Sequence, residues 1–329
     1  KVIAWGTAAN INPSDVTLET NLFLVDGTWF VTNLNKSIYV VCMGATSTNK
    51  NYWTGTGTWS TVANWSLGHA PLPGEDVEFD FRALANCSAN IVSNNLGSIT
   101  LAAGYTNTVT FASNAVAGGM NLTVAGNIVV RAGNLVFGGD PTAIGAGSVG
   151  TPFGVGYTVM VANVSISTGA SINADNGGFP QNAGPGKPAA SRWGASYGGR
   201  GGISLYTNAF PLPPCYGTAA GPTALGSGGS SGGFNTGGGA IKLVVSGTAT
   251  ISGRLSASST LNNQNASMGS GGSVWIASGT LEGNGIIAAN GGTGGNTLCG
   301  GGGGRIDISG TTNNFVGTLQ AIGGIPNGL

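Results

Sequence analysis

Apolar and polar positions alternate in short runs through the C-terminal part of the chain, and one phrase of this kind occurs three times. In its first copy Ile241, Leu243 and Val245 fall on one face of an extended segment. The copies close on three alanines spaced 32 residues apart, Ala257, Ala289 and Ala321. Period-two alternation predicts strands. A fixed repeat of this length predicts a solenoid in which each unit buries its apolar face on the next.

The rest of the chain after residue 83 continues this pattern less regularly. Residues 164–174 form a further copy of the phrase, and a Gly/Pro-rich insertion at about 176–236 separates it from the later copies. No window between the runs has the spacing, the caps or the length of a helix. We therefore predict an all-β protein with a parallel β-helix over 83–329. Because crossovers between parallel strands prefer one hand, we expect it to be right-handed.

The first fifty residues, 1–50, differ from the solenoid pattern because they contain three strongly apolar runs. The Asp26-Gly27 pair between the first two runs predicts a hairpin, and the third run would complete a small antiparallel sheet. This region is either a cap over the open end of the solenoid or an arm that adds a strand to a neighbouring subunit. The residues expected at such an assembly contact are Leu22, Phe23, Leu24, Trp29, Phe30, Ile38, Tyr39 and Val40.

Residues 51–82 form a third region, which is rich in tryptophan. Trp53, Trp59 and Trp65 lie close together in it. Clustered indole rings can stack on the apolar faces of sugars, which makes these residues glycan-binding candidates. In the alternative interpretation they fill the core of a small β module.

The composition narrows the class of protein. Gly supplies 62 of 329 residues, and only 7% are charged where about 25% is ordinary. The 41% of hydrophobic residues argues against disorder. The net charge is zero and no basic stripe is present, so we expect no nucleic-acid partner. No apolar run reaches the roughly 18 residues of a transmembrane segment. The chain begins at Lys1 without Met, as expected of a processed product.

Four cysteines are present, none of them at metal-binding spacing: Cys42, Cys87, Cys215 and Cys299. Four cysteines allow three disulfide connectivities. We expect Cys42 to pair with Cys87 and Cys215 with Cys299, since the members of each pair share a region of similar composition. Disulfides fit an oxidising, extracellular setting. The alternative is four buried free thiols.

The sequence contains few residues in arrangements that known catalytic mechanisms use. The one histidine, His69, lies far upstream of the Ser-containing segments that resemble a nucleophile elbow, which argues against a Ser-His-Asp hydrolase. Glycoside hydrolysis needs paired carboxylates. The acidic residues beyond 83 are few: Asp140, Asp175, Glu282 and Asp307. Asp175, beside the insertion, is the one candidate for a lyase or hydrolase. We expect no enzyme and no cofactor.

The repeated GGAIKL, GGSVWI and GGGGRIDI phrases, together with ASYGGRGG at 195–202, resemble large secreted bacterial Gly-rich β-helix and adhesin-like surface proteins. The segment WTGTGTWSTVANWSLGHAPLPGEDV is similar to a module of secreted bacterial repeat proteins. The resemblance covers about residues 52–324. It implies a location at the cell surface or outside the cell and a structural or adhesive role, and it carries no catalytic residues.

These observations favour a structural protein that assembles with copies of itself through its N-terminal arm and its solenoid ends, for example into a filament. The open end of the solenoid and the apolar arm are different surfaces, so a contact between them leaves a free arm and a free end on each growing assembly. Such contacts produce a filament unless the assembly closes into a ring. The alternative is an adhesin that binds surface glycans through the tryptophans or through the insertion.

Overall fold

The computed structural model divides the chain into two compact units, Lys1–Lys50 and Asn51–Leu329. For residues 28–34, 37–43 and 262–263 it describes the backbone alone. The residues that it describes are 28–34, 37–43, 50–83, 85–90, 92–113, 116, 119–145, 152–203, 213–230, 235–260, 262–263, 267–295 and 299–325.

The N-terminal unit contains an antiparallel pair of strands, β1 (Thr28–Leu34) and β2 (Ser37–Met43), in which Val31 lies opposite Val40. The predicted antiparallel pairing of the second and third apolar runs is therefore confirmed. The expected hairpin at Asp26-Gly27 lies outside the described residues. So do Leu22, Phe23 and Leu24, and so do the side chains of Trp29, Phe30, Ile38, Tyr39 and Val40.

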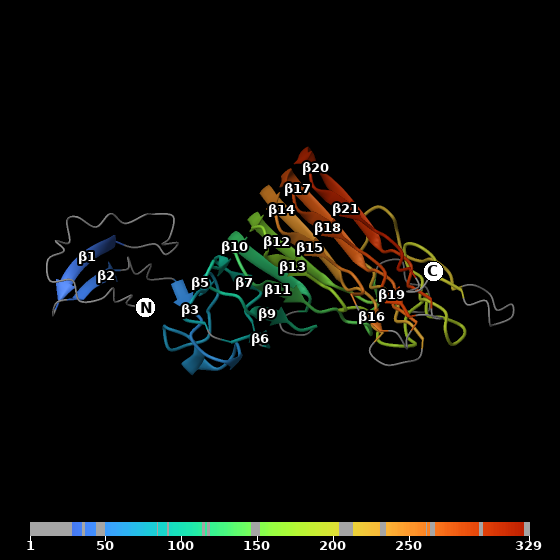
Figure 1. Cartoon of the computed structure of the whole chain (residues 1–329), viewed down its shortest axis with the longest axis horizontal. Coiled ribbons are helices and arrows are strands. Elements are labelled where there is room, and N and C mark those ends of the chain that lie inside the picture. The colour runs from blue at the N-terminus through green and yellow to red at the C-terminus, as the bar shows by residue number, and fades with distance from the viewer. Residues whose placement is uncertain are drawn as a thin grey trace. The chain divides into compact units, whose positions relative to one another are not determined.

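The second unit is built from two parallel sheets that run along the chain in the same order (Figure 1). The first sheet has 9 strands and the second has 8, because each coil of the chain contributes a strand to each sheet and β7 adds one to the first. The first sheet comprises β3 (Lys50–Tyr52), β5 (Asp76–Phe79), β7 (Asn95–Leu96), β8 (Ile99–Leu101), β10 (Asn121–Val130), β12 (Tyr157–Ile166), β14 (Ala240–Ile251), β17 (Ser273–Gly283) and β20 (Arg305–Phe315). The second comprises β4 (Gly57–Thr58), β6 (Cys87–Ala89), β9 (Thr108–Phe111), β11 (Asn134–Phe137), β13 (Ser171–Asn173), β15 (Arg254–Ser256), β18 (Ile286–Ala288) and β21 (Thr318–Gln320).

On the third side of the coils the chain runs through glycine- and serine-rich loops, where β16 (Asn262–Asn263) pairs with β19 (Thr293–Gly294). In the described part of the chain the one helical segment is a short 3-10 turn, Val62–Asn64. No helix among these residues has the length and apolar character needed to span a membrane.

The strand register confirms the repeat that the sequence predicts. Val274 lies opposite Ile306, and Ile287 lies opposite both Leu255 and Leu319. The earlier copy also aligns, since Ile172 lies opposite Leu255 across the insertion. The coils are therefore stacked in register as an all-β parallel solenoid.

The alternation seen in the sequence sorts side chains between core and surface. Along β10, Leu122, Val124, Ile128 and Val130 are buried, while the residues between them are partly or fully exposed. Equivalent positions in successive coils lie above one another and form one continuous apolar core. Burial of this core is the main favourable contribution to the stability of the fold.

The tryptophan-rich segment is part of this solenoid. β3 and β5 join the first sheet and β4 joins the second, so the coils begin within residues 51–82 and not at residue 83. The short strands explain why the sequence pattern did not reveal these coils, since β4 has only 2 residues and β3 only 3. Runs of two or three residues are too short to display a period.

The insertion packs against the glycine-rich side of the late coils in the parts that the structure describes. The Gly199 amide donates to the Gly303 carbonyl at 2.8 Å, and the Gly202 amide donates to Gly300 at 2.9 Å. A Cβ at Gly194 would lie 1.9 Å from the Gly300 carbonyl oxygen, so only glycine allows this backbone contact. The richness in glycine of both segments is thus a requirement of their packing.

Candidate functional site

The three tryptophans that were candidates for sugar stacking lie inside the first coils. The side chains of Trp53 and Trp59 are fully buried and that of Trp65 is 3% exposed. Their rings pack edge to face, with 4.7 Å between the centroids of Trp59 and Trp65 and 5.1 Å between those of Trp53 and Trp65. None of these rings has an exposed face on which a sugar could stack. They are core residues of the first coils, where all three rings pack against Phe79.

The expected disulfides are not formed among the described residues. Cys87, Cys215 and Cys299 are free thiols, and the side chain of Cys42 lies outside the described residues. Cys87 points into the core from β6 and Cys299 is buried beside the insertion, whereas Cys215 is exposed. A disulfide requires two facing Cβ atoms. Shared local composition did not indicate that arrangement, and the expected pairing of Cys215 with Cys299 was wrong.

The different burial of the thiols predicts their reactivity. Burial raises the pKa of the Cys87 thiol well above its ordinary value, and it also raises the pKa of Cys299. Because the thiolate is the reactive form, we expect iodoacetamide to modify Cys215 roughly tenfold or more faster than Cys87 in the folded protein. Mass spectrometry of labelled peptides measures this difference. Labelling of Cys215 only after reduction would contradict this prediction and would indicate a Cys215–Cys299 disulfide.

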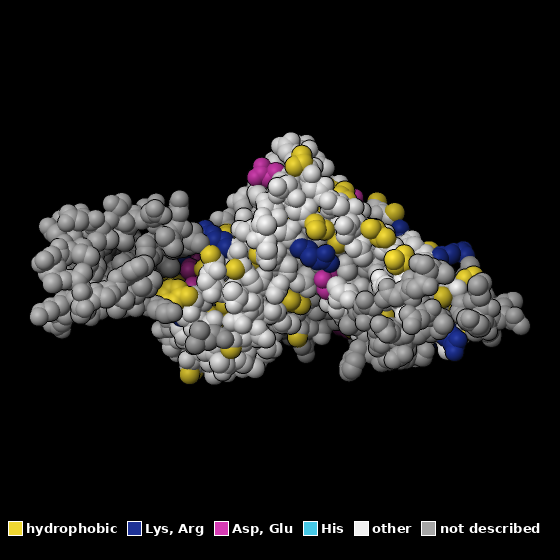
Figure 2. Space-filling model, in the orientation of Figure 1, with side chains coloured by type: hydrophobic (Ala, Val, Ile, Leu, Met, Phe, Trp, Pro, Cys, Tyr) yellow, Lys and Arg dark blue, Asp and Glu magenta, His cyan; other side chains and the backbone are white. Residues whose placement is uncertain are grey.

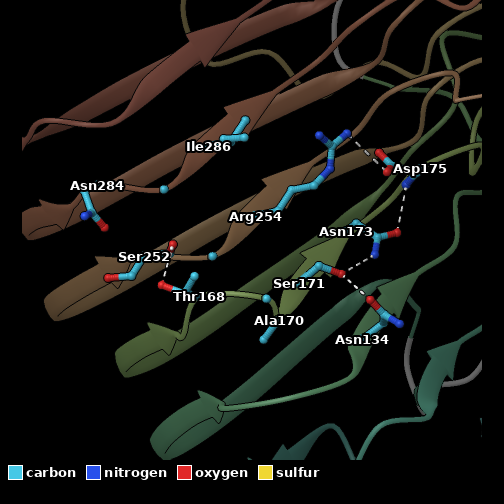
Figure 3. Close-up of a pocket in the computed structure, with 13 residues that line it drawn as sticks. Asn134, Thr168, Ala170, Ser171, Asn173, Asp175, Ser252, Arg254, Asn284 and Ile286 are labelled. Carbon is cyan, nitrogen blue, oxygen red and sulfur yellow. Dashed lines mark hydrogen bonds and ion pairs between the residues drawn. The ribbon is translucent and has the colours of Figure 1, made fainter.

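An open hollow lies on the outer side of the second sheet, across β11, β13, β15 and β18 (Figure 3). It has a volume of about 600 Å³. Glycine, alanine and isoleucine residues line part of it, and polar or charged side chains line the rest. The lining residues with polar or charged side chains are Asn134, Thr168, Ser171, Asn173, Asp175, Ser252, Arg254 and Asn284.

Hydrogen bonds fix the side chains along this hollow. Ser171 Oγ donates to Asn134 Oδ1 at 2.8 Å, and Asn173 Nδ2 donates to Ser171 Oγ at 2.9 Å. Asp175 accepts the Ser258 amide at 2.6 Å through Oδ1, and its Oδ2 lies 3.6 Å from Arg254 Nη2. Asp175, which the sequence suggested as a catalytic candidate, therefore contacts the Arg254 guanidinium group and the Ser258 backbone amide. None of the other lining residues is acidic, so the hollow does not hold the paired carboxylates that glycoside hydrolysis uses.

Sequence reasoning missed Arg254. It lies at an outward position of the repeated phrase, opposite Ser171 on one side and Ile286 on the other. The signal available in the sequence was a charge at a repeat position that is uncharged in the other copies. Only the register places this charge beside Asp175, since 79 residues separate the two in the sequence.

The second distinctive surface is the free edge of the last coil. β20 pairs with β17 on one side only, and β21 pairs only with β18, so each is the terminal strand of its sheet among the described residues. Ile306, Ile308 and Phe315 occupy core positions but are only partly buried. The exposed apolar residues beside them are Val316, Leu319, Ile322 and Ile325.

A ladder of hydrogen bonds along one corner of the coils also ends there. The Ser258 amide donates to Asp175 Oδ1, the Asn290 amide to Ser258 Oγ at 3.0 Å, and the Ile322 amide to Asn290 Oδ1 at 3.0 Å. Each corner residue before Ile322 therefore binds the backbone of the following coil. Ile322 has no acceptor in its side chain and is 59% exposed, so the corner of the last coil is apolar.

Charged side chains are sparse on the surface, and on the face drawn in Figure 2 they are scattered among uncharged ones. Within the part of the chain that the structure describes, no group of three or more His, Cys, Asp or Glu residues could hold a metal ion. Comparisons of the chain with protein-family models, with curated proteins and with solved structures found no match.

Proposed function

We propose that this chain is an extracellular structural protein that assembles with copies of itself, by pairing the N-terminal arm of one copy with the free edge of the last coil of the next. The observation that carries the proposal is the edge itself. β20 is an 11-residue strand with one unpaired side, bordered by exposed apolar residues. An unpaired row of backbone donors and acceptors is a template for a strand of another chain.

The arm has the properties of a complementary partner. β1 and β2 are each 7 residues long, and two-stranded sheets of this kind are only marginally stable by themselves in water. Addition to β20 would give the arm a larger sheet to join. A contact between an arm and an edge is heterologous, and it propagates into a filament if it does not close into a ring.

Two further features belong to the proposal. We propose a right-handed solenoid, because parallel crossovers are right-handed in about 98% of cases. The location outside the cell or on its surface rests on the sparse charge and on the resemblance of the repeated phrases to secreted repeat proteins. Few charges at the edge leave little electrostatic repulsion between copies, since Arg305 and Asp307 are the only charged residues of β20.

Charges placed at the apolar border of the edge test the proposal. Val316 is 81% exposed and Leu319 is 54% exposed, so the double variant Val316→Glu/Leu319→Glu should fold normally. We expect it to remain monomeric under conditions in which the unmodified chain polymerises, because the contact would bury two carboxylates without partners. Sedimentation velocity and negative-stain electron microscopy measure this.

The matched control is Val62→Glu, which places a carboxylate at a residue that is 55% exposed and lies in the first coil. We expect this variant to polymerise like the unmodified chain. Polymers of unchanged length in the double variant would contradict the assignment of the edge as the contact.

A further inference from the structure

Two neighbouring hollows on the solenoid share one side chain, the guanidinium group of Arg254. The first is the hollow of about 600 Å³ described above, and the second has a volume of about 220 Å³. The second is lined by Arg254, Ser258, Ser259, Thr260, Asn290, Gly291 and Thr293. Together they form a trough, and Arg254, the one cationic residue that lines it, belongs to both parts.

Arg254 is held in place from one side. Its Nε donates to Ser256 Oγ at 3.0 Å, and its Nη2 lies 3.5 Å from Ser258 Oγ and 3.6 Å from Asp175 Oδ2. Figure 3 shows one guanidinium nitrogen turned toward Asp175 and another turned away from it. Among the described residues Nη1 has no hydrogen-bond partner, and the side chain is 36% exposed. A guanidinium group that is held in place, is always charged and has free N–H donors is suited to bind a carboxylate.

The remaining walls of the trough suit a ligand that carries many hydroxyl groups. Asn, Ser and Thr side chains from four successive coils line the larger hollow. Four strands spaced by about 4.8 Å extend over roughly 14 Å along the sheet. Gly169, Ala170, Gly253 and Gly285 also line the larger hollow, and their side chains are small or absent. An extended chain can therefore lie across several coils and contact a row of amide and hydroxyl groups.

Other ligand classes fit this trough less well. A single arginine cannot supply the many phosphate contacts through which proteins bind nucleic acid. A peptide that binds by strand addition needs a free sheet edge, but β13 and β15 are paired on both sides. A metal ion would require several acidic ligands, and Asp175 is the only acidic residue that lines either hollow.

We propose that this trough binds an acidic glycan, with a uronate carboxylate on the free Nη1 edge of Arg254 and the sugar hydroxyls on the Asn, Ser and Thr side chains. Asp175 acts as a positioning residue that orients the guanidinium group. The site lies apart from the buried tryptophans and from the edge of the last coil, and it does not depend on self-assembly.

The test uses the full chain and a defined probe, a hexamer of galacturonic acid, with binding measured by isothermal titration calorimetry. We expect Arg254→Gln to weaken binding of this hexamer by about tenfold or more, because a charge-assisted contact to the ligand carboxylate is lost. Arg200→Gln is the matched control, since Arg200 is exposed and lines neither hollow, and it should leave the affinity unchanged. Asn284→Ala, at an exposed wall residue, should weaken binding by a few-fold.

Two further measurements separate carboxylate recognition from other contacts. The same hexamer with its carboxyl groups reduced to alcohols should bind at least about tenfold more weakly to the unmodified chain. Asp175→Ala should weaken binding of the acidic hexamer by a few-fold, because it removes the carboxylate that orients the guanidinium group. The proposal would be overturned by equal affinity for the two hexamers, by unchanged affinity in Arg254→Gln with an unchanged melting curve, or by no binding at all.

Discussion

Deleting residues 1–49 is expected to abolish the proposed self-assembly and to leave soluble monomers. The deletion removes β1 and β2 and keeps Lys50, the first residue of β3. Residues Asn51–Leu329 form a compact unit of their own, so the solenoid should fold without the arm. Without an arm the edge strand β20 has no partner in the proposed contact. Sedimentation velocity and electron microscopy, together with circular dichroism to confirm the β structure, provide the measurement.

A mixing experiment makes this prediction more specific. The deletion variant has a free edge but no arm, and Val316→Glu/Leu319→Glu has an arm but a blocked edge. Each should be monomeric alone, while an equimolar mixture should form dimers that grow no further, because only one arm–edge pair can form in each complex. Dimers of the deletion variant alone would show that like ends associate. Polymers of the deletion variant would rule out the arm as the connecting element.

The second large effect is expected from Trp59→Ala, which should lower the free energy of unfolding of the first coils by about 3–5 kcal/mol. Trp59 is fully buried, and its ring centroid lies 4.7 Å from that of Trp65 and 5.9 Å from that of Phe111. Its indole N–H has no hydrogen-bond partner among the described residues, so the loss comes from packing and cavity formation. Urea denaturation and amide hydrogen exchange measure this effect.

Trp275→Ala is the matched control for this substitution. Trp275 is only partly buried on the outer face of β17, where Lys242 Nζ lies 3.6 Å from the ring centroid. Loss of this cation–π contact should cost about 1 kcal/mol. Hydrogen exchange should localise the effect of Trp59→Ala to the first coils, because solenoid stability is a sum of contacts between neighbouring repeats. A folded Trp59→Ala protein of unchanged stability that loses only glycan binding would contradict the core assignment.

Side-chain alternation made the late coils predictable from the sequence. Once Ala257, Ala289 and Ala321 are aligned, the partners of Leu255 and Ile287 in neighbouring coils follow, and the structure has the same pairs. The alternation of a strand and the spacing of a repeat are both local properties of the chain. The insertion was found in the same way, as an interruption between two copies of one phrase.

The sites were far less predictable, because they depend on residues that are distant in the sequence. The indole ring of Trp59 could pack in a core or bind a sugar, and only its contacts with neighbouring coils decide that it is buried. Cys215 and Cys299 share a glycine-rich context, but one side chain is exposed and the other is buried. The pairing of Arg254 with Asp175 was equally invisible, since an insertion separates them.

The sequence by itself determined that this protein is a stack of parallel β coils with an apolar N-terminal segment, because strand period and repeat length are encoded residue by residue. The tertiary structure alone decided where the first coil begins, which tryptophans and thiols are buried, and which polar groups gather around Arg254. The physical reason is the register. Stacking brings side chains from different coils within a few ångströms of one another, and no local pattern specifies which of them will meet.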